Sequence, residues 1–337
     1  MKETISLNLG NEEIVFADLT DRENLELVIV CKSGNIFLFD CQTETRSLFT
    51  NLSFNPYQLN LQIHSFENYI CITQKNGLQG MVIDLSNPSF QQNLERVDYQ
   101  AEHCLFPIAF YKKENQTFLI HGTEWNRLDI TCLETDELLT SRIVDYETNS
   151  NYFDYFHSSL LISPDAKNFT SNGWVWQPCD VITVYSIERF LKEFETSHTA
   201  INFEPVDGYN WDRPLCWIDN TTLGIGYNKK EDGESKEDFP SEVIFVDIIE
   251  NQTTNRIEFD GFALSEDGAA VGELIFDSNK NQFIGLNKKS GLLITDIMGK
   301  EIYKDNSMTS HKYSKRHKLF YKIERDQKSM EITILQK

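Results

Sequence analysis

Short apolar runs separated by polar turns recur along the chain, and the clearest example runs from residue 27 to 40, LVIVCKSGNIFLFD. Two runs rich in β-branched residues flank a Lys-Ser-Gly-Asn segment, in which Gly34 can supply the positive φ of a tight turn. The pattern predicts an antiparallel hairpin whose second strand closes on Asp40. Similar hairpins recur along the rest of the sequence.

The second strand of this hairpin recurs seven times in all, ending at residues 40, 84, 132, 186, 247, 296 and 334. The spacings between these ends are 44, 48, 54, 61, 49 and 38 residues. A period in the forties with four short strands per period is typical of a β-propeller blade. The pattern therefore predicts an all-β fold with seven blades.

Each repeat divides into four strands, here called a to d from the innermost to the outermost. In the third repeat, for example, the outermost strand is expected at Leu138–Val144. The seventh repeat has no fourth strand, whereas an additional strand, Thr4–Leu9, precedes the first repeat. We expect this N-terminal strand to complete the last blade, because that pairing removes two open sheet edges. This match favours seven blades over six or eight, in a single domain covering residues 1–337.

The repeats resemble those of WD-repeat propellers over nearly all of the chain. The aspartates at 40, 84, 247 and 296 stand where the family's Trp-Asp pair ends its third strand. Ser163–Lys167 (SPDAK) and Ser265–Gly268 (SEDG) are similar to the family's Ser-Pro-Asp-Gly turn. The tryptophan of the Trp-Asp pair and the family's Gly-His pair are missing, so the tetrad that they build in regular members is not expected. Other propeller families with weaker signatures remain open.

Two segments depart from the strand pattern. Residues 186–196 (SIERFLKEFET) place Ile187, Phe190, Leu191 and Phe194 at helical spacing, which predicts a short helix packed on blade four. Residues 229–241 (KKEDGESKEDFPS) form a polar insertion in blade five, which predicts a mobile loop.

Composition narrows the class of protein. Of the 337 residues, 40% are hydrophobic and 12% aromatic, which is ample material for a large core. The net charge is −21, and such an acidic surface disfavours binding to nucleic acid or to an anionic membrane. The same charge leaves attraction of a basic protein as one functional possibility.

The sequence predicts a cytoplasmic protein without a cofactor. The N-terminal stretch contains Glu3, Glu12 and Glu13 and does not resemble a secretory leader, and no run is long enough to span a membrane. The seven cysteines are odd in number and lack C-x-x-C spacing, so we expect buried reduced thiols. The seven histidines show no paired metal spacing, and we expect no metal site. No phosphate-binding loop, dinucleotide fingerprint or G-x-S-x-G motif occurs.

Aromatic residues concentrate in the loops of blades three to five. In a propeller the b–c tips and the d–a connections emerge on one face, and sorting the loops this way places four of the five tryptophans there. The candidate ligand- or partner-binding residues on this face are Trp125, Asn126, Arg127, Tyr152, Phe153, Trp174, Trp176, Tyr209, Trp211, Asp212 and Arg213.

Tryptophan, tyrosine and arginine commonly anchor binding sites because they bury a large area and keep a polar group. The alternative is that these rings pack together simply to hold long loops. Arg127 and Arg213 suit a carboxylate or phosphate ligand. Equally, Glu124 and Asp212 stand close enough in sequence to neutralise them.

These observations favour a cytosolic scaffold propeller that binds a protein or peptide through the aromatic face, with a small molecule as another possible ligand. The alternative is a propeller hydrolase or lyase acting on a small or sugar-like substrate, with Glu124, His121, Asp212 and Arg213 nearby. No recognisable nucleophile–base pair supports that enzyme, and no catalytic residue is assigned.

Overall fold

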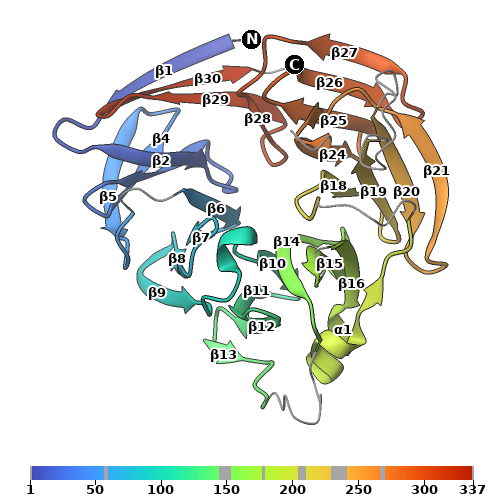
Figure 1. Ribbon diagram of the computed structural model, residues 1–337. Helices are drawn as coiled ribbons and strands as arrows, with labels where there is room; N and C mark the ends of the chain where they lie inside the picture. The colour runs from blue at the N-terminus through green and yellow to red at the C-terminus, as the bar shows by residue number, and fades with distance from the viewer. Residues whose placement is uncertain are drawn as a thin grey trace. The chain divides into compact units, whose positions relative to one another are not determined.

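The computed structural model describes residues 2–56, 60–143, 153–176, 179–203, 210–228, 241–265 and 270–335. These residues form seven four-stranded antiparallel sheets, one two-stranded hairpin and one short α-helix. The sheets are the blades of a seven-bladed β-propeller, which confirms the predicted fold class (Figure 1).

The chain divides into two compact units. The first contains residues 1–106 and 311–337 and holds blades one, two and seven. The second contains residues 107–310 and holds blades three to six. The expectation of a single domain therefore stays a prediction.

The blades of the first unit follow the predicted repeat. Blade one consists of β2 (Ile14–Leu19), β3 (Glu26–Cys31), β4 (Asn35–Asp40) and β5 (Thr45–Asn51). Blade two consists of β6 (Leu61–Phe66), β7 (Tyr69–Gln74), β8 (Gln79–Asp84) and β9 (Asn87–Glu95), followed by the 3-10 turn η1 (Ala101–His103). Blade seven consists of β28 (Lys312–Ser314), β29 (Leu319–Arg325), β30 (Ser329–Leu335) and β1 (Lys2–Asn8).

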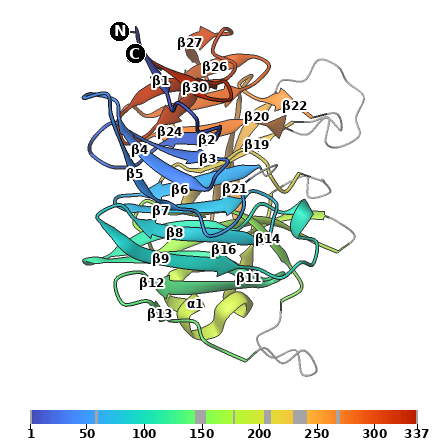
Figure 2. The same cartoon turned by 90° about the vertical axis from the view of Figure 1, so that its left-hand side faces the viewer.

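The N-terminal strand completes the last blade, as the sequence predicts. β1 pairs antiparallel with β30 over seven residue pairs, from Lys2 opposite Leu335 to Asn8 opposite Ser329. The two ends of the chain consequently lie side by side (Figure 2). Ile5 of β1 is buried in the core of this unit with Ile332 of β30.

The second unit carries the longer loops. Blade three consists of β10 (Ile108–Lys113), β11 (Gln116–Glu124), β12 (Arg127–Cys132) and β13 (Glu137–Leu138). Blade four consists of β14 (Phe156–Ile162), β15 (Asn168–Val175), β16 (Cys179–Ser186) and β17 (Thr199–Ala200). Blade five consists of β18 (Leu215–Trp217), β19 (Thr222–Tyr227), β20 (Glu242–Asp247) and β21 (Gln252–Glu258). Blade six consists of β24 (Glu273–Asp277), β25 (Gln282–Asn287), β26 (Gly291–Asp296) and β27 (Glu301–Asp305).

The burial of each strand follows from its place in the blade. All six residues of β3 are buried, because a middle strand is covered on both faces by neighbouring blades. This burial accounts for the continuous apolar run at residues 27–31. In contrast, the outermost strand β5 is mostly exposed and polar.

The recurrent aspartates at the end of the third strand cap the turn that follows. Asp40 Oδ1 accepts hydrogen bonds from the backbone N–H groups of Gln42 and Thr43, at 2.8 and 2.9 Å. Asp247 and Asp296 accept equivalent backbone bonds two to four residues ahead. An aspartate is therefore favoured here by local turn chemistry, without the Trp-Asp tetrad.

Blade three differs from the prediction at its outermost strand. The expected strand Leu138–Val144 is reduced to Glu137–Leu138, and Val144 lies outside the described residues. Side chains take over part of the pairing with β12. Thr140 Oγ1 accepts from the Ile130 N–H at 2.9 Å, Glu195 Oε1 accepts from the Leu128 N–H at 2.7 Å, and Arg142 donates to the Leu128 carbonyl at 3.2 Å.

Arg142 and Glu195, together with Asp129, form a buried ion network between blades three and four. Arg142 is paired with Asp129 at 2.9 Å and with Glu195 at 2.5 Å. Burial raises the pKa of Glu195, even though Arg142 opposes that shift. Burial acts in the same direction on Asp129, but hydrogen bonds from Thr123 and Arg127 outweigh it and leave its pKa lowered.

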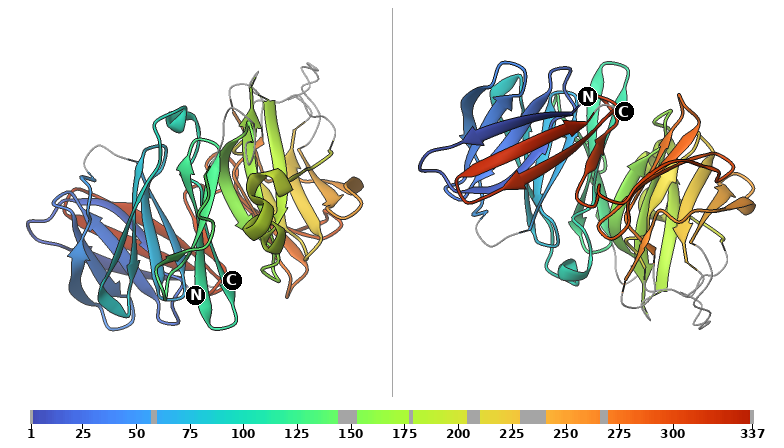
Figure 3. Two further views of the ribbon diagram at one scale, coloured as in Figure 1. Left: turned by 90° about the horizontal axis from the view of Figure 1, so that it is seen from below. Right: turned by 90° about the horizontal axis from the view of Figure 1, so that it is seen from above.

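The structure also bears on the predicted helix, and it adds a short hairpin that the sequence does not predict. The predicted helix is α1 (Ile187–Glu193), followed by the 3-10 turn η2 (Phe194–Ser197); Ile187 and Phe190 are buried. α1, yellow-green in Figure 3, contacts β16. The short hairpin of β22 (Ala263–Leu264) and β23 (Ala270–Val271) is not expected from the sequence. Of the loop predicted at 229–241, residues 229–240 lie outside the described residues.

All seven cysteines lie in the described ranges, where they form no disulfide, and six of them are buried. Within the same ranges, no helix is both long enough and apolar enough to cross a membrane.

Candidate functional site: an aromatic cluster on blades three to five

The centre of the site is a stacked pair of rings in blade four. Phe156, the first residue of β14, lies opposite Trp174 of β15, and the two rings stack at 3.8 Å with an interplanar angle of 7°. The sequence places Trp174 at a loop tip, but β15 continues through Val175, so Trp174 belongs to the strand. Trp176 follows directly after the strand, in the turn that leads toward β16.

Three more tryptophans join this pair. The Trp176 ring stands perpendicular to Phe156, at 5.4 Å and 90°, and to Trp174, at 5.3 Å and 87°. Trp125, in the β11–β12 turn, contacts Phe156 at 4.7 Å, and Trp211, before β18, contacts Trp174 at 5.6 Å. We call Trp125, Phe156, Trp174, Trp176 and Trp211 the tryptophan cluster. It brings together residues from three blades of the second unit.

Exposure differs strongly within the tryptophan cluster. Phe156 and Trp174 are 1% and 3% exposed, Trp125 and Trp211 are half-buried, and Trp176 is 47% exposed. The buried rings therefore pack the loops together. Of the five residues, Trp176 is the most exposed, and its ring packs against the buried rings of Phe156 and Trp174.

The two candidate arginines are neutralised by partners that the sequence does not indicate. Arg213 is 3% exposed; its Nε donates to Asp180 Oδ2 at 3.0 Å, and its Nη2 donates to the same oxygen. Arg127 is paired with Asp129 at 3.0 Å. The structure thus shows Asp180 and Asp129 as ion-pair partners of the two arginines. Both guanidinium groups are occupied inside the fold.

The remaining candidates support the loops. Asn126 is buried, and its Nδ2 donates to the Phe153 carbonyl at 3.0 Å. The Phe153 ring stacks on His198 at 3.8 Å. Asp212 is exposed, and its Oδ1 accepts from Ser158 Oγ at 3.2 Å. Tyr152 and Tyr209 lie outside the described residues.

Two of the groups considered for catalysis, His121 and Arg213, are buried and have structural partners. His121 is 7% exposed, and its Nε2 lies 3.2 Å from Thr131 Oγ1; burial lowers its pKa. Arg213 is held by Asp180. In the part of the chain that the structure describes, no three His, Cys, Asp or Glu side chains are grouped so as to hold a metal ion.

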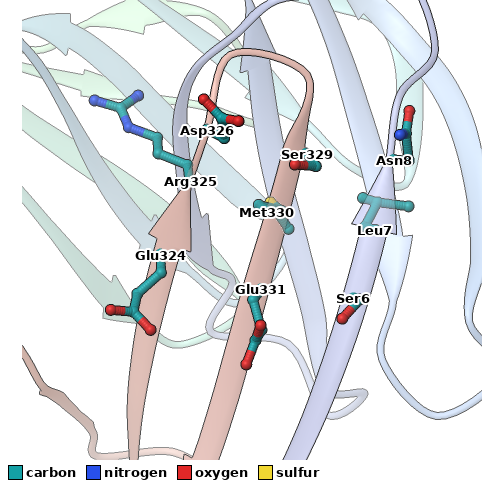
Figure 4. Close-up of a pocket in the computed structure, with 9 residues that line it drawn as sticks. All are labelled: Ser6, Leu7, Asn8, Glu324, Arg325, Asp326, Ser329, Met330 and Glu331. Atoms are coloured by element: carbon teal, nitrogen blue, oxygen red, sulfur yellow. The ribbon is translucent and has the colours of Figure 1, made fainter.

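Of the hollows that described residues line elsewhere, two include apolar side chains. One is on blade seven and is lined by residues of β29, β30 and β1, among them Arg325, Met330 and Leu7 (Figure 4). The other runs between blades three and four beside α1, with Phe118, Tyr111 and Ile187 among its apolar lining residues. The sequence indicates neither hollow, because the side chains that line each one come from separate strands and turns.

Sequence reasoning misses two residues of the site. Phe156 lies at the centre of the tryptophan cluster. The sequence places it only at the end of the connection between blades three and four, among other aromatic residues. Asp180 lies just after the tip in sequence, but its pairing with Arg213 spans 33 residues. No local signal identifies such a partner, since it depends on how blades four and five pack.

Comparisons with known proteins bear on the fold alone. No family model matches the sequence, and no curated protein matches it. Among solved structures, 1226 chains match. One, titled "Crystal Structure of Mitotic Checkpoint Complex", is similar with a TM-score of 0.58 and 8% sequence identity, over 97% of this chain and 92% of that chain. At this identity the likeness confirms the propeller architecture expected from the resemblance to WD-repeat proteins.

Proposed function

We propose that this protein is a cytoplasmic scaffold propeller that binds another protein or a peptide through the tryptophan cluster. The observation that carries the proposal is the exposed ring of Trp176, supported at right angles by the buried rings of Phe156 and Trp174. A large exposed ring on a rigid base is typical of the anchor residues that contribute most of the energy of an interface.

The mechanism is rigid presentation. Phe156 and Trp174 are fixed in paired strands, and Asn126 ties the β11–β12 turn to the Phe153 backbone. Because these groups are already ordered, a partner does not need to supply their ordering entropy on binding. The proposed cytoplasmic location is supported by the seven reduced thiols.

The test is affinity capture with the full chain, followed by measurement of binding between this chain and each captured partner in purified form. We expect Trp176→Ala to weaken binding at least about tenfold, as truncation of an interface anchor commonly does. Trp176 is the appropriate position because it is half-exposed. By comparison, Trp174→Ala would also remove a buried ring and unsettle the fold.

Ile249→Ala is the matched control, since Ile249 is an exposed apolar residue, 70% accessible, in the β20–β21 turn. Both variants are expected to unfold at the wild-type denaturant concentration. Equal partner binding by wild type, Trp176→Ala and Ile249→Ala would sink the proposal.

A further inference from the structure

We propose that Met298, in the turn between β26 and β27, is a site of reversible oxidation to methionine sulfoxide by a peroxide. The modification converts an exposed apolar side chain into a polar one and leaves the blade beneath it intact. Met298 belongs to blade six and not to the tryptophan cluster. The inference therefore does not depend on the proposed partner binding.

The first argument is accessibility. The sequence contains five methionines, and four of them lie in the described ranges. Met298 is 72% exposed, whereas Met81, Met308 and Met330 are 3% exposed or less. Oxidation of a sulfur atom requires that the oxidant reach it. A peroxide therefore attacks Met298 in the folded chain, while the three buried sulfurs react only when the structure opens.

The second argument is that the turn is held without the Met298 side chain. Asp296 Oδ1 accepts hydrogen bonds from the N–H groups of Met298 and Lys300, each at 2.9 Å. The Gly299 N–H donates to the Asp296 carbonyl at 3.1 Å. Gly299 has a φ of +83°, and a Cβ there would lie only 2.9 Å from the Glu258 carbonyl oxygen of β21. Because backbone contacts fix the turn, a polar group on the exposed side chain leaves the fold in place.

The third argument is the surface that oxidation changes. β27 is the outermost strand of blade six (Figure 1). Its residues Ile302 and Tyr303 are 50% and 37% exposed, so the β26–β27 hairpin presents three large side chains with apolar surface to solvent. A sulfoxide at Met298 places a strong hydrogen-bond acceptor among them. Oxidation consequently lowers the hydrophobicity of this hairpin.

The cysteines compete poorly for the oxidant. A peroxide reacts with a thiolate rather than a thiol, and burial raises the pKa of Cys31 and Cys41 to about 12. Burial also raises the pKa of Cys71. At about pH 6 an ordinary thiol is almost fully protonated, whereas a thioether has no proton to lose. Mildly acidic conditions therefore leave methionine as the reactive sulfur.

The reaction needs only the peroxide as co-reactant. The Met298 sulfur attacks one peroxide oxygen, the O–O bond breaks, and a sulfur–oxygen bond forms. The sulfur is oxidised by two electrons, and the departing hydroxide takes the proton of the transferred oxygen and leaves as water. In the reverse direction, a methionine sulfoxide reductase releases the oxygen as water and oxidises two thiols to a disulfide. The exposed turn gives such an enzyme access to the side chain.

The experiment treats the full folded chain with hydrogen peroxide at about pH 6 and quantifies each methionine sulfoxide by peptide mass spectrometry. The same chain unfolded in urea gives the intrinsic rate of each methionine. We expect folding to slow Met298 by no more than about twofold, and to slow Met81, Met308 and Met330 at least about tenfold. Equal slowing of all four would overturn the inference, because Met298 would then be protected by the fold.

Met298→Leu is the matched variant, since leucine is apolar, similar in volume and free of sulfur. Peroxide should shorten the retention of the wild type on a hydrophobic-interaction column and leave that of Met298→Leu unchanged. Both methionine sulfoxide reductases, one for each sulfoxide epimer, should then restore the wild-type mass and retention in the presence of dithiothreitol.

Each of three other results would contradict the inference. An equal change of retention in Met298→Leu would place the oxidised site elsewhere. Sulfoxide that the reductases fail to remove would show that the modification is not reversible. A lower urea midpoint in the oxidised wild type than in the peroxide-treated variant would show that oxidation disturbs the blade.

Discussion

At the scale of single residues, Ala166 adopts a backbone conformation that is strained for any residue other than glycine. It lies in the β14–β15 turn with φ of +53°, where glycine is the residue that adopts this conformation without strain. The turn is otherwise well formed: Asp165 Oδ1 accepts from Ser163 Oγ at 2.8 Å and from the Lys167 N–H at 3.2 Å.

Ala166→Gly is therefore expected to stabilise the protein. Relief of the left-handed strain should exceed the entropy lost to the more flexible unfolded chain, for a net gain of about 0.5 to 1 kcal/mol. Urea unfolding monitored by circular dichroism measures the difference. Ala263→Gly is the control, because Ala263 lies in the strand β22, where glycine should destabilise. A loss of stability in Ala166→Gly would contradict this account.

His157 illustrates a buried histidine held in its neutral form. It is 3% exposed, and its Nδ1 lies 3.0 Å from Ser171 Oγ. Burial, reinforced by the positive charge of Arg142, lowers its pKa to about 3. In the unfolded chain the same imidazole titrates with a pKa of about 6.5.

Stability should consequently fall as the pH decreases below about 6.5, because the unfolded chain then binds a proton at His157 that the folded chain does not. The contribution is fully present above about pH 6.5 and is lost progressively toward about pH 3. In this interval His157 alone adds a slope of about 1.4 kcal/mol per pH unit. Urea unfolding of wild type and His157→Gln at several pH values between neutral and mildly acidic measures it. Parallel slopes in the two proteins would count against the assignment.

At the scale of elements, the sequence predicts the middle strands well and the outer strands less well. β3, β19 and β25 are continuous apolar runs because both faces are buried, and periodicity identifies such runs directly. The predicted outer strand of blade three extends well beyond the observed one. Its pairing is replaced by Thr140, Arg142 and Glu195, and Glu195 lies 53 residues from Arg142 in sequence.

The candidate site, like the strands, can be predicted from the sequence only in part. That four tryptophans share a region could be inferred from strand order alone. Their exposure could not, because whether Trp174 lies in a strand or a loop depends on the pairing of Val175 with Cys179. The pairing of Arg213 with Asp180 depends on how two blades pack, which local patterns do not encode.

The strand that completes blade seven gives a prediction at this scale. Ile5 is 5% exposed and packs in the core of the first unit, whereas its neighbour Thr4 faces solvent. Ile5→Ala should lower the free energy of unfolding by about 2 to 5 kcal/mol through the cavity it leaves. Thr4→Ala, the matched control in the same strand, should change it by about 0.5 kcal/mol or less. Similar effects of the two substitutions in chemical unfolding would mean that β1 is not packed as described.

At the scale of the whole molecule, charge is the dominant property. The sequence has 52 acidic and 31 basic residues, so repulsion between carboxylates opposes the folded state. Adding sodium chloride from about 0.02 to 0.2 M shortens the Debye length and weakens that repulsion. The midpoint of thermal unfolding should rise. An equal osmolality of an uncharged solute such as glycerol distinguishes screening from solvent effects, and an unchanged or lower midpoint in salt would refute the explanation.

The distribution of thiols has a practical consequence for the proposed contact surface. Burial raises the pKa of Cys31 and Cys41 to about 12, so these thiols rarely ionise and react slowly with alkylating reagents. Cys179 is the one cysteine of the seven that is partly accessible, and it begins β16 three residues after Trp176. A maleimide dye should therefore label the wild-type chain mainly at Cys179. The protein carries a natural attachment point for a fluorescent reporter beside the surface on which a partner is expected to dock.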